Sequence, residues 1–139
     1  LESNDSIKLK EVRDLGEEGL AEYTKGLNQE RSISVARLDG YMQTGGIESI
    51  DLLKIDTQGF EPEVLEGPGD RLKNVSIVLA ELMFYDYYER SLSFSDIEQW
   101  LLPAGLRIYD INHISRNPMN GRTDWVDVIY VNERVQRGK

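Results

Sequence analysis

The hydrophobic positions of this chain fall into short segments that alternate between strand-like and helix-like spacing. Five segments have the length and branched apolar residues of strands: Ser32–Leu38, Ile50–Asp56, Val75–Leu82, Leu106–Ile111 and Trp125–Val131. Three segments between them carry helix signals, which are Asp39–Thr44, Pro62–Glu66 and Ser95–Leu102. Acidic residues in the first turn and a proline at a first helical position mark the starts of these helices. The glycines that follow mark their ends.

The order of these elements predicts the fold class. Strands that alternate with helices pair in parallel through crossovers, so an α/β fold with a mostly parallel sheet is expected. The last two strands are joined by the loop His113–Asp124, which has Asn, Pro and Gly but no helix pattern. A terminal antiparallel strand is therefore predicted. Residues 1–31 lack a strong apolar period and are expected to be a lead-in segment, in which Glu17–Leu27 can form a short helix.

Composition narrows the class of protein and its partners. The chain has 139 residues, of which 40% are hydrophobic and 29% charged, as in one soluble domain. Its formal net charge of −9 disfavours nucleic acids and anionic membranes, and no apolar run reaches the ~20 residues that cross a bilayer. The absence of cysteine and the single histidine, His113, exclude thiolate and multi-histidine metal sites. We expect a cytoplasmic protein with no nucleic-acid or membrane partner and no metal.

Two carboxylates at the ends of neighbouring predicted strands form the candidate site. Ligands of open α/β sheets bind beyond the carboxyl ends of parallel strands. Asp56 ends one such strand and Glu81 lies at the end of the next. The Asp56 carboxylate either binds a substrate hydroxyl and takes its proton, or it caps the following turn. Glu81 either binds a substrate or forms a salt bridge or cap within the protein.

Four further residues follow these strand ends. Gly59 permits a positive φ or a close backbone approach, and Glu61 either lines the pocket or favours the start of a helix. His113 either enters the same cleft or is incidental in a polar loop. Tyr85 belongs to an aromatic run that either forms a substrate-binding lip or packs against the next helix.

The segment Ile50–Gly67, IDLLKIDTQGFEPEVLEG, resembles the signature of FkbM-type methyltransferases, I-D-L-L-K-I-D-x-E-G-F-E-x-x-V-L-x-G. The upstream sequence VARLDGY is similar to the family's approach to that strand. The downstream order also follows the family: a buried strand that ends near Glu, a helix that ends in Gly and a closing strand that contains Asp. The resemblance covers about Ser32 to Asn132.

This resemblance implies a Rossmann-like methyltransferase sheet of seven strands whose final strand is antiparallel. Residues 32–139 would form its carboxyl-terminal part and supply strands four to seven. It also implies S-adenosylmethionine as cofactor and a small-molecule, sugar or lipid-linked hydroxyl as methyl acceptor. Asp56 would be catalytic and, with Gly59, would contact the cofactor. The candidate substrate-binding residues are Glu61, Glu81, Tyr85 and His113.

Two departures from the family leave alternatives open. Gln58 stands where the family has Glu, and no glycine-rich G-x-G-x-x-G run precedes Ser32. The chain begins with Leu1 and is expected to be a fragment that is inactive alone and binds the cofactor weakly. The alternative is a non-catalytic α/β binding or assembly module, and a weaker third hypothesis is a cation-dependent hydrolase that uses Asp56 and Glu81.

A truncated sheet would also leave one backbone edge open. The strand that pairs with the far side of Ile50–Asp56 in the complete family sheet would be missing. Unpaired strand edges attract another strand. We therefore expect Ser32–Leu38 or a second copy of the chain, in a homodimer, to cover this edge.

Overall fold

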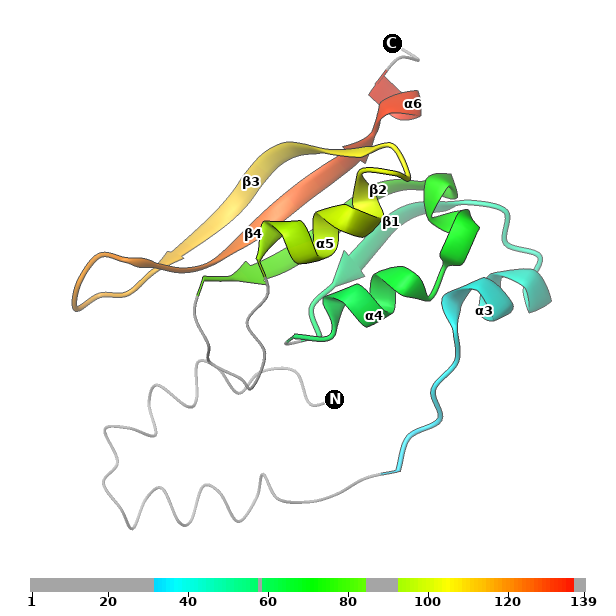
Figure 1. Cartoon of the computed structure of the whole chain (residues 1–139), viewed down its shortest axis with the longest axis horizontal. Helices are drawn as coiled ribbons and strands as arrows, with labels where there is room; N and C mark the ends of the chain where they lie inside the picture. The colour runs from blue at the N-terminus through cyan, green and yellow to red at the C-terminus, as the bar shows by residue number, and fades with distance from the viewer. Residues whose placement is uncertain (1–31, 58, 85–92, 137–139) are drawn as a thin grey trace. The chain divides into compact units, whose positions relative to one another are not determined.

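The computed structural model describes residues 32–57, 59–84 and 93–136. The chain divides into two units, Leu1–Val35 and Ala36–Lys139, and every element below belongs to the second. Its elements in chain order are α3 (Leu38–Thr44), β1 (Ile50–Ile55), α4 (Glu61–Glu66), the 3₁₀ helix η1 (Gly69–Asn74), β2 (Val75–Met83), α5 (Phe94–Leu101), β3 (Leu106–Arg116), β4 (Thr123–Asn132) and α6 (Glu133–Gln136) (Figure 1).

One four-stranded sheet joins the described strands in the order β1-β2-β4-β3. β1 pairs with β2 in parallel, and β4 runs antiparallel to both β2 and β3. The α/β class and the antiparallel pairing of the last two strands are confirmed. The expectation of a mostly parallel sheet is wrong, because β4 lies between β2 and β3 and makes two of the three neighbouring pairs antiparallel. β1, β2 and β3 nevertheless run in one direction.

The core lies on the side of the sheet that carries α4 and α5 (Figure 1). Alternate residues of β2 and β4 point to this side, as the two-residue period of strands requires. They meet buried residues that recur every four positions in α5, Ile97 and Leu101, together with Leu65 of α4. The buried strand residues on this face are Val78, Ala80, Leu82, Val126, Val128 and Tyr130.

The predicted strand Ser32–Leu38 is wrong. Residues 32–37 form no strand, and α3 begins at Leu38. Local contacts favour the helix start, because the Asp39 carboxylate accepts a hydrogen bond from the Gly40 amide at 2.7 Å. The Arg37 guanidinium contacts the carboxylates of Asp39 and Glu66 at 3.3 and 3.7 Å, so the residue directly before α3 is bound to the end of α4 rather than paired in the sheet.

The hairpin of β3 and β4 is longer than its apolar pattern predicts. β3 continues to Arg116 and β4 begins at Thr123, so both ends of the expected loop His113–Asp124 are paired strand. Register shifts interrupt the pairing near Ile108, Ile111 and Ser115. These irregularities explain why β3 lacks a clean alternation of apolar and polar residues.

The outer edge of β1 pairs with no other strand in the part of the chain that the structure describes. Ser32–Leu38 does not form the strand that was expected to cover it, so that half of the prediction is wrong. Pairing with a second copy of the chain stays a prediction. Within the described ranges, no helix combines the length and the apolar character that crossing a bilayer requires.

Candidate functional site

Asp56 follows directly after β1, at the carboxyl end of a strand that pairs in parallel with β2. Its carboxylate accepts a hydrogen bond from the Lys54 ammonium, with 2.9 Å between Nζ and Oδ2. The two residues are two positions apart, so both side chains leave the strand on the same face. The Asp56 side chain is 30% exposed, which leaves it accessible to a ligand. Its predicted position is confirmed, and its role stays a prediction.

The Asp56 carboxylate raises the pKa of the Lys54 ammonium above the ordinary 10.5, first through their hydrogen bond and then through their opposite charges. The charges of Asp127 and Glu81 add to this increase. The charges of Asp56, Glu81 and Asp127 therefore all act on the Lys54 ammonium.

We expect the Lys54 amine to titrate above pH 10.5 in the folded protein. The stability that this contact adds is present below pH 10.5 and is lost as the pH rises through the folded pKa. It amounts to less than about 1 kcal/mol because the pair is solvent-exposed. An NMR titration of the Lys54 side chain measures the midpoint. In Asp56→Asn the midpoint should fall back towards that of a free lysine, and a wild-type midpoint at or below that value would contradict the assignment.

The turn after Asp56 is held by Glu61, which is 2% exposed. Its Oε1 accepts hydrogen bonds from the Thr57 amide at 2.9 Å and the Thr57 hydroxyl at 3.1 Å, and its Oε2 accepts one from the Gly59 amide at 3.0 Å. Gly59 has a φ of 107°, which only glycine adopts easily. The expected positive φ at Gly59 is confirmed. The Glu61 carboxylate is already engaged by the turn, although it was predicted to bind substrate, and no finding tests that role.

Glu81 and His113 lie in one row across the sheet. Glu81 of β2 is in register with Asp127 of β4, and Asp127 is in register with His113 of β3. Residues opposite each other in paired strands share a face, so the structure brings both predicted residues to the same side. His113 lies within β3 rather than in a loop. No finding tests whether either residue binds substrate.

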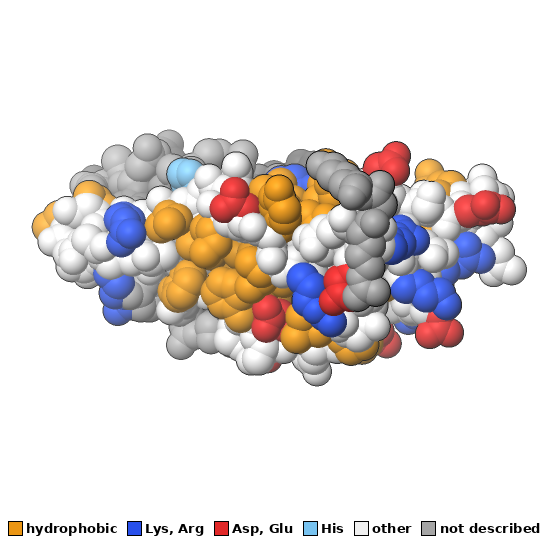
Figure 2. Space-filling model, turned by 90° about the horizontal axis from the view of Figure 1, so that it is seen from above, with side chains coloured by type: hydrophobic (Ala, Val, Ile, Leu, Met, Phe, Trp, Pro, Cys, Tyr) orange, Lys and Arg blue, Asp and Glu red, His pale blue; other side chains and the backbone are white. Residues whose placement is uncertain are grey.

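This row lies on the face of the sheet opposite to α4 and α5. Half-buried apolar residues of β2 and β4 surround it: Ile77, Leu79, Met83, Trp125 and Ile129. The face therefore combines apolar area with a small set of ionisable groups. Seen from above the view of Figure 1, hydrophobic side chains also gather in a surface patch with charged side chains beside it (Figure 2).

Tyr85, a predicted substrate-binding residue, and Gln58, which departs from the family motif, lie outside the described residues. Lys54 and Asp127 were not predicted to be parts of a site. The available signal was that each is a charged residue inside an otherwise apolar strand. Only the register of the strands showed that they face Glu81 and His113.

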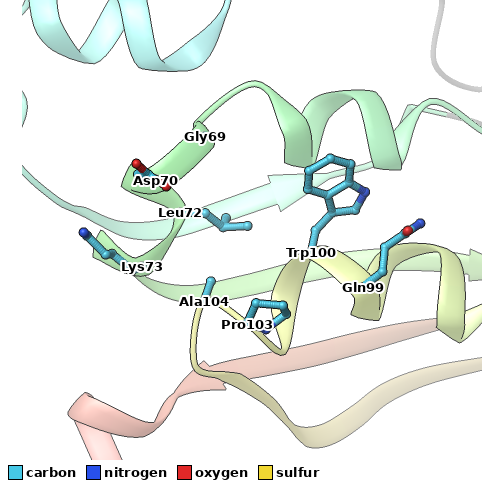
Figure 3. Close-up of a pocket in the computed structure, with 8 residues that line it drawn as sticks. All are labelled: Gly69, Asp70, Leu72, Lys73, Gln99, Trp100, Pro103 and Ala104. Atoms are coloured by element: carbon cyan, nitrogen blue, oxygen red, sulfur yellow. The ribbon is translucent and has the colours of Figure 1, made fainter.

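A pocket of about 430 Å³ lies between η1 and α5. Asp70 and Lys73 of η1 line one side, and Gln99 and Trp100 of α5 line the other (Figure 3). η1 precedes β2 and α5 precedes β3, so this pocket opens near the amino ends of those strands. No residue of the candidate site lines it.

A family model described as "Methyltransferase FkbM domain" matches residues 4–108, which are most of the chain. The chain belongs to the FkbM methyltransferase family. The match includes β1, α4, β2 and α5 and ends within β3, so Asp56, Gly59, Glu61 and Glu81 lie inside it. His113 and Asp127 lie beyond the matched range.

One relative of this chain is the 2-O-methyltransferase NoeI of Sinorhizobium fredii (strain NBRC 101917 / NGR234). The two sequences are 34% identical over 73 residues, which are 52% of this chain and 30% of the relative. The alignment thus spans under a third of the relative's length. No solved structure matches the chain.

Among the residues that the structure describes, no group of three or more His, Cys, Asp or Glu side chains could hold a metal ion. The hypothesis of a cation-dependent hydrolase stays a prediction. The ionisable side chains described above are the carboxylates of Asp56, Glu61, Glu81 and Asp127, the Lys54 ammonium and the His113 imidazole.

Proposed function

We propose that the protein transfers a methyl group from S-adenosylmethionine to a hydroxyl oxygen of a small molecule, sugar or lipid-linked group. The observation that carries this proposal is Asp56, a partly exposed carboxylate at the carboxyl end of β1 that lies within the family's motif. The name of the related 2-O-methyltransferase supports oxygen as the accepting atom. The family membership supports methyl transfer as the reaction.

The residues of the site fit the deprotonation that such a transfer needs. S-adenosylmethionine, when bound, supplies an electrophilic methyl group on a sulfonium. The Asp56 carboxylate would accept the proton that the acceptor hydroxyl loses when its oxygen takes the methyl group that S-adenosylmethionine would supply. The Lys54 ammonium, 2.9 Å from Asp56, holds the carboxylate in one orientation, and such positioning accounts for much of the rate of a group transfer.

Part of the cofactor site is assigned to this chain. Asp56 presents a hydrogen-bond acceptor, and Gly59 has no side chain to keep a ligand from the turn. The 139 residues contain no glycine-rich G-x-G-x-x-G run, so we assign no residue here to the methionine end of the cofactor. The chain matches 30% of its relative's length, and we propose that it does not bind the cofactor tightly alone.

The acceptor lies on the face that carries Glu81 and His113. Carboxylate and imidazole groups bind the hydroxyls of a polyol through hydrogen bonds, and the apolar residues beside them suit the carbon face of a sugar ring. Asp127, between them in register, adds a second carboxylate. We assign Glu61 to the turn rather than to the substrate.

The test is transfer of a radiolabelled methyl group by the complete protein. The protein is incubated with S-adenosylmethionine labelled in its methyl group and a panel of monosaccharides and their lipid-linked forms. Label should enter at least one hydroxyl-bearing acceptor, and calorimetry should show binding of S-adenosylmethionine. If neither binding nor transfer occurs, the proposed function is wrong.

The alternative is a non-catalytic binding or assembly module, and the unpaired edge of β1 in the described part of the chain favours it. In that case the edge pairs with β1 of a second copy, since open strand edges add further strands. Light scattering would then report a homodimer, and a proline at Leu52, a central β1 position, would dissociate it. A dimer without methyl transfer would favour the alternative.

A further inference from the structure

We infer that Glu61 is a positioning residue: its buried carboxylate fixes the backbone on which Asp56 stands. This inference rests on the proposed function and adds to it a residue that acts through Asp56. Glu61 is the first residue of α4, and its side chain turns back towards the end of β1. A carboxylate that is 2% exposed needs hydrogen-bond donors, and Thr57 and Gly59, the described residues of the turn, supply three.

The hydrogen bond to the Thr57 amide acts directly on Asp56. That N–H belongs to the peptide group that joins Asp56 to Thr57, and the peptide group is planar. Holding the N–H 2.9 Å from Glu61 Oε1 therefore holds the Asp56 carbonyl as well. The Thr57 hydroxyl adds a second bond to the same oxygen at 3.1 Å.

The other carboxylate oxygen fixes the far side of the turn. Oε2 accepts from the Gly59 amide at 3.0 Å, at the residue whose φ is 107°. The chain is thus held on both sides of residue 58. Because the Lys54 ammonium holds the Asp56 side chain at 2.9 Å, Asp56 is restrained through its backbone by Glu61 and through its carboxylate by Lys54.

The two oxygens of Glu61 allow a sharp substitution. Glu61→Gln preserves size and can keep one oxygen opposite the two Thr57 donors. The new amide group then faces the Gly59 N–H, and a donor meets a donor. Glu63→Gln is the matched control, because Glu63 lies in the first turn of the same helix, is exposed, and undergoes the same loss of charge.

The experiment compares both variants with the wild type in the complete protein. For Glu61→Gln, we expect amide hydrogen exchange at Gly59 to rise about tenfold or more as its hydrogen bond is lost. We expect kcat for methyl transfer to fall about tenfold to 100-fold through misplacement of Asp56, with KM for the acceptor changed less than about twofold. Glu63→Gln should leave all three values unchanged.

Several outcomes would overturn the inference. Wild-type kcat and wild-type Gly59 exchange in a folded Glu61→Gln variant would show that the carboxylate positions nothing. An equal fall of kcat in Glu63→Gln would assign the effect to charge near the helix start rather than to the turn. If Glu61→Gln does not fold, Thr57→Val, which removes only the hydroxyl bond, should still lower kcat, and an unchanged kcat would contradict the role. A wild-type protein that transfers no methyl group would instead overturn the proposed function, and the inference with it.

Discussion

Replacing Asp56 with Asn in the complete protein should lower kcat for methyl transfer by about 100-fold or more. The amide keeps the size of the side chain but cannot accept the proton that the acceptor hydroxyl loses. The Lys54 ammonium also loses the charged partner that lies 2.9 Å away. A transfer assay with labelled S-adenosylmethionine measures the loss, at saturating concentrations of both substrates.

Asp51→Asn is the control for this prediction. Asp51 lies in β1, the strand that Asp56 directly follows. It is exposed and projects from the opposite face, since it is an odd number of residues from Asp56. Its substitution should leave kcat within about twofold of the wild type, as expected for a surface residue away from the site. Equal kcat in wild type and Asp56→Asn, or an equal fall in both variants, would remove the catalytic assignment of Asp56.

The second large effect is expected on stability, from Asn132→Ala. Asn132 ends β4 and is 4% exposed. Its Nδ2 donates to the carbonyls of Lys73, Val75 and Ala104 at 3.1–3.2 Å, and its Oδ1 accepts from the Arg134 amide at 3.2 Å. One side chain thus joins the start of β2, the turn before β3 and the end of β4.

Alanine at position 132 leaves these carbonyls with fewer donors in a buried environment. We expect the free energy of unfolding to fall by about 2–4 kcal/mol, because each unsatisfied buried group costs about 1–3 kcal/mol. Urea unfolding followed by circular dichroism measures the change. Asn112→Ala on the exposed part of β3 is the control and should change stability by less than about 0.5 kcal/mol. Equal losses in the two variants would contradict the role of Asn132.

The position of Asn132 illustrates what a pattern of residues cannot reveal. Its hydrogen-bond partners Lys73, Val75 and Ala104 lie 28 to 59 positions away in the sequence. In the sequence, Asn132 is a polar residue that directly follows an apolar segment, which is typical of the first residue of a loop. Only the assembled sheet places three carbonyls around its amide, so tertiary structure alone identifies it.

The candidate site divides in the same way. The position of Asp56 at the end of a strand could be predicted, because a dense apolar run followed by a turn with Gly59 is a local signal. The row of Glu81, Asp127 and His113 could not, because register between strands depends on long-range pairing and a shift of one residue moves every side chain to the other face. His113 was expected in a loop because bulges in β3 hide its strand period.

The sequence by itself determined the three helices α3, α4 and α5 and the strands β1 to β4 in their order, because periodicity, caps and breakers act over a few residues. It did not indicate η1 or α6, and it wrongly predicted a strand at Ser32–Leu38. It also determined the family, through the IDLLKID motif. Tertiary structure alone decided that β4 lies between β2 and β3, that Ser32–Leu38 forms no strand, and that the Glu61 carboxylate accepts hydrogen bonds from the turn after β1. The physical reason is that local signals fix backbone conformation, whereas strand partners and buried polar contacts depend on which distant segments pack together.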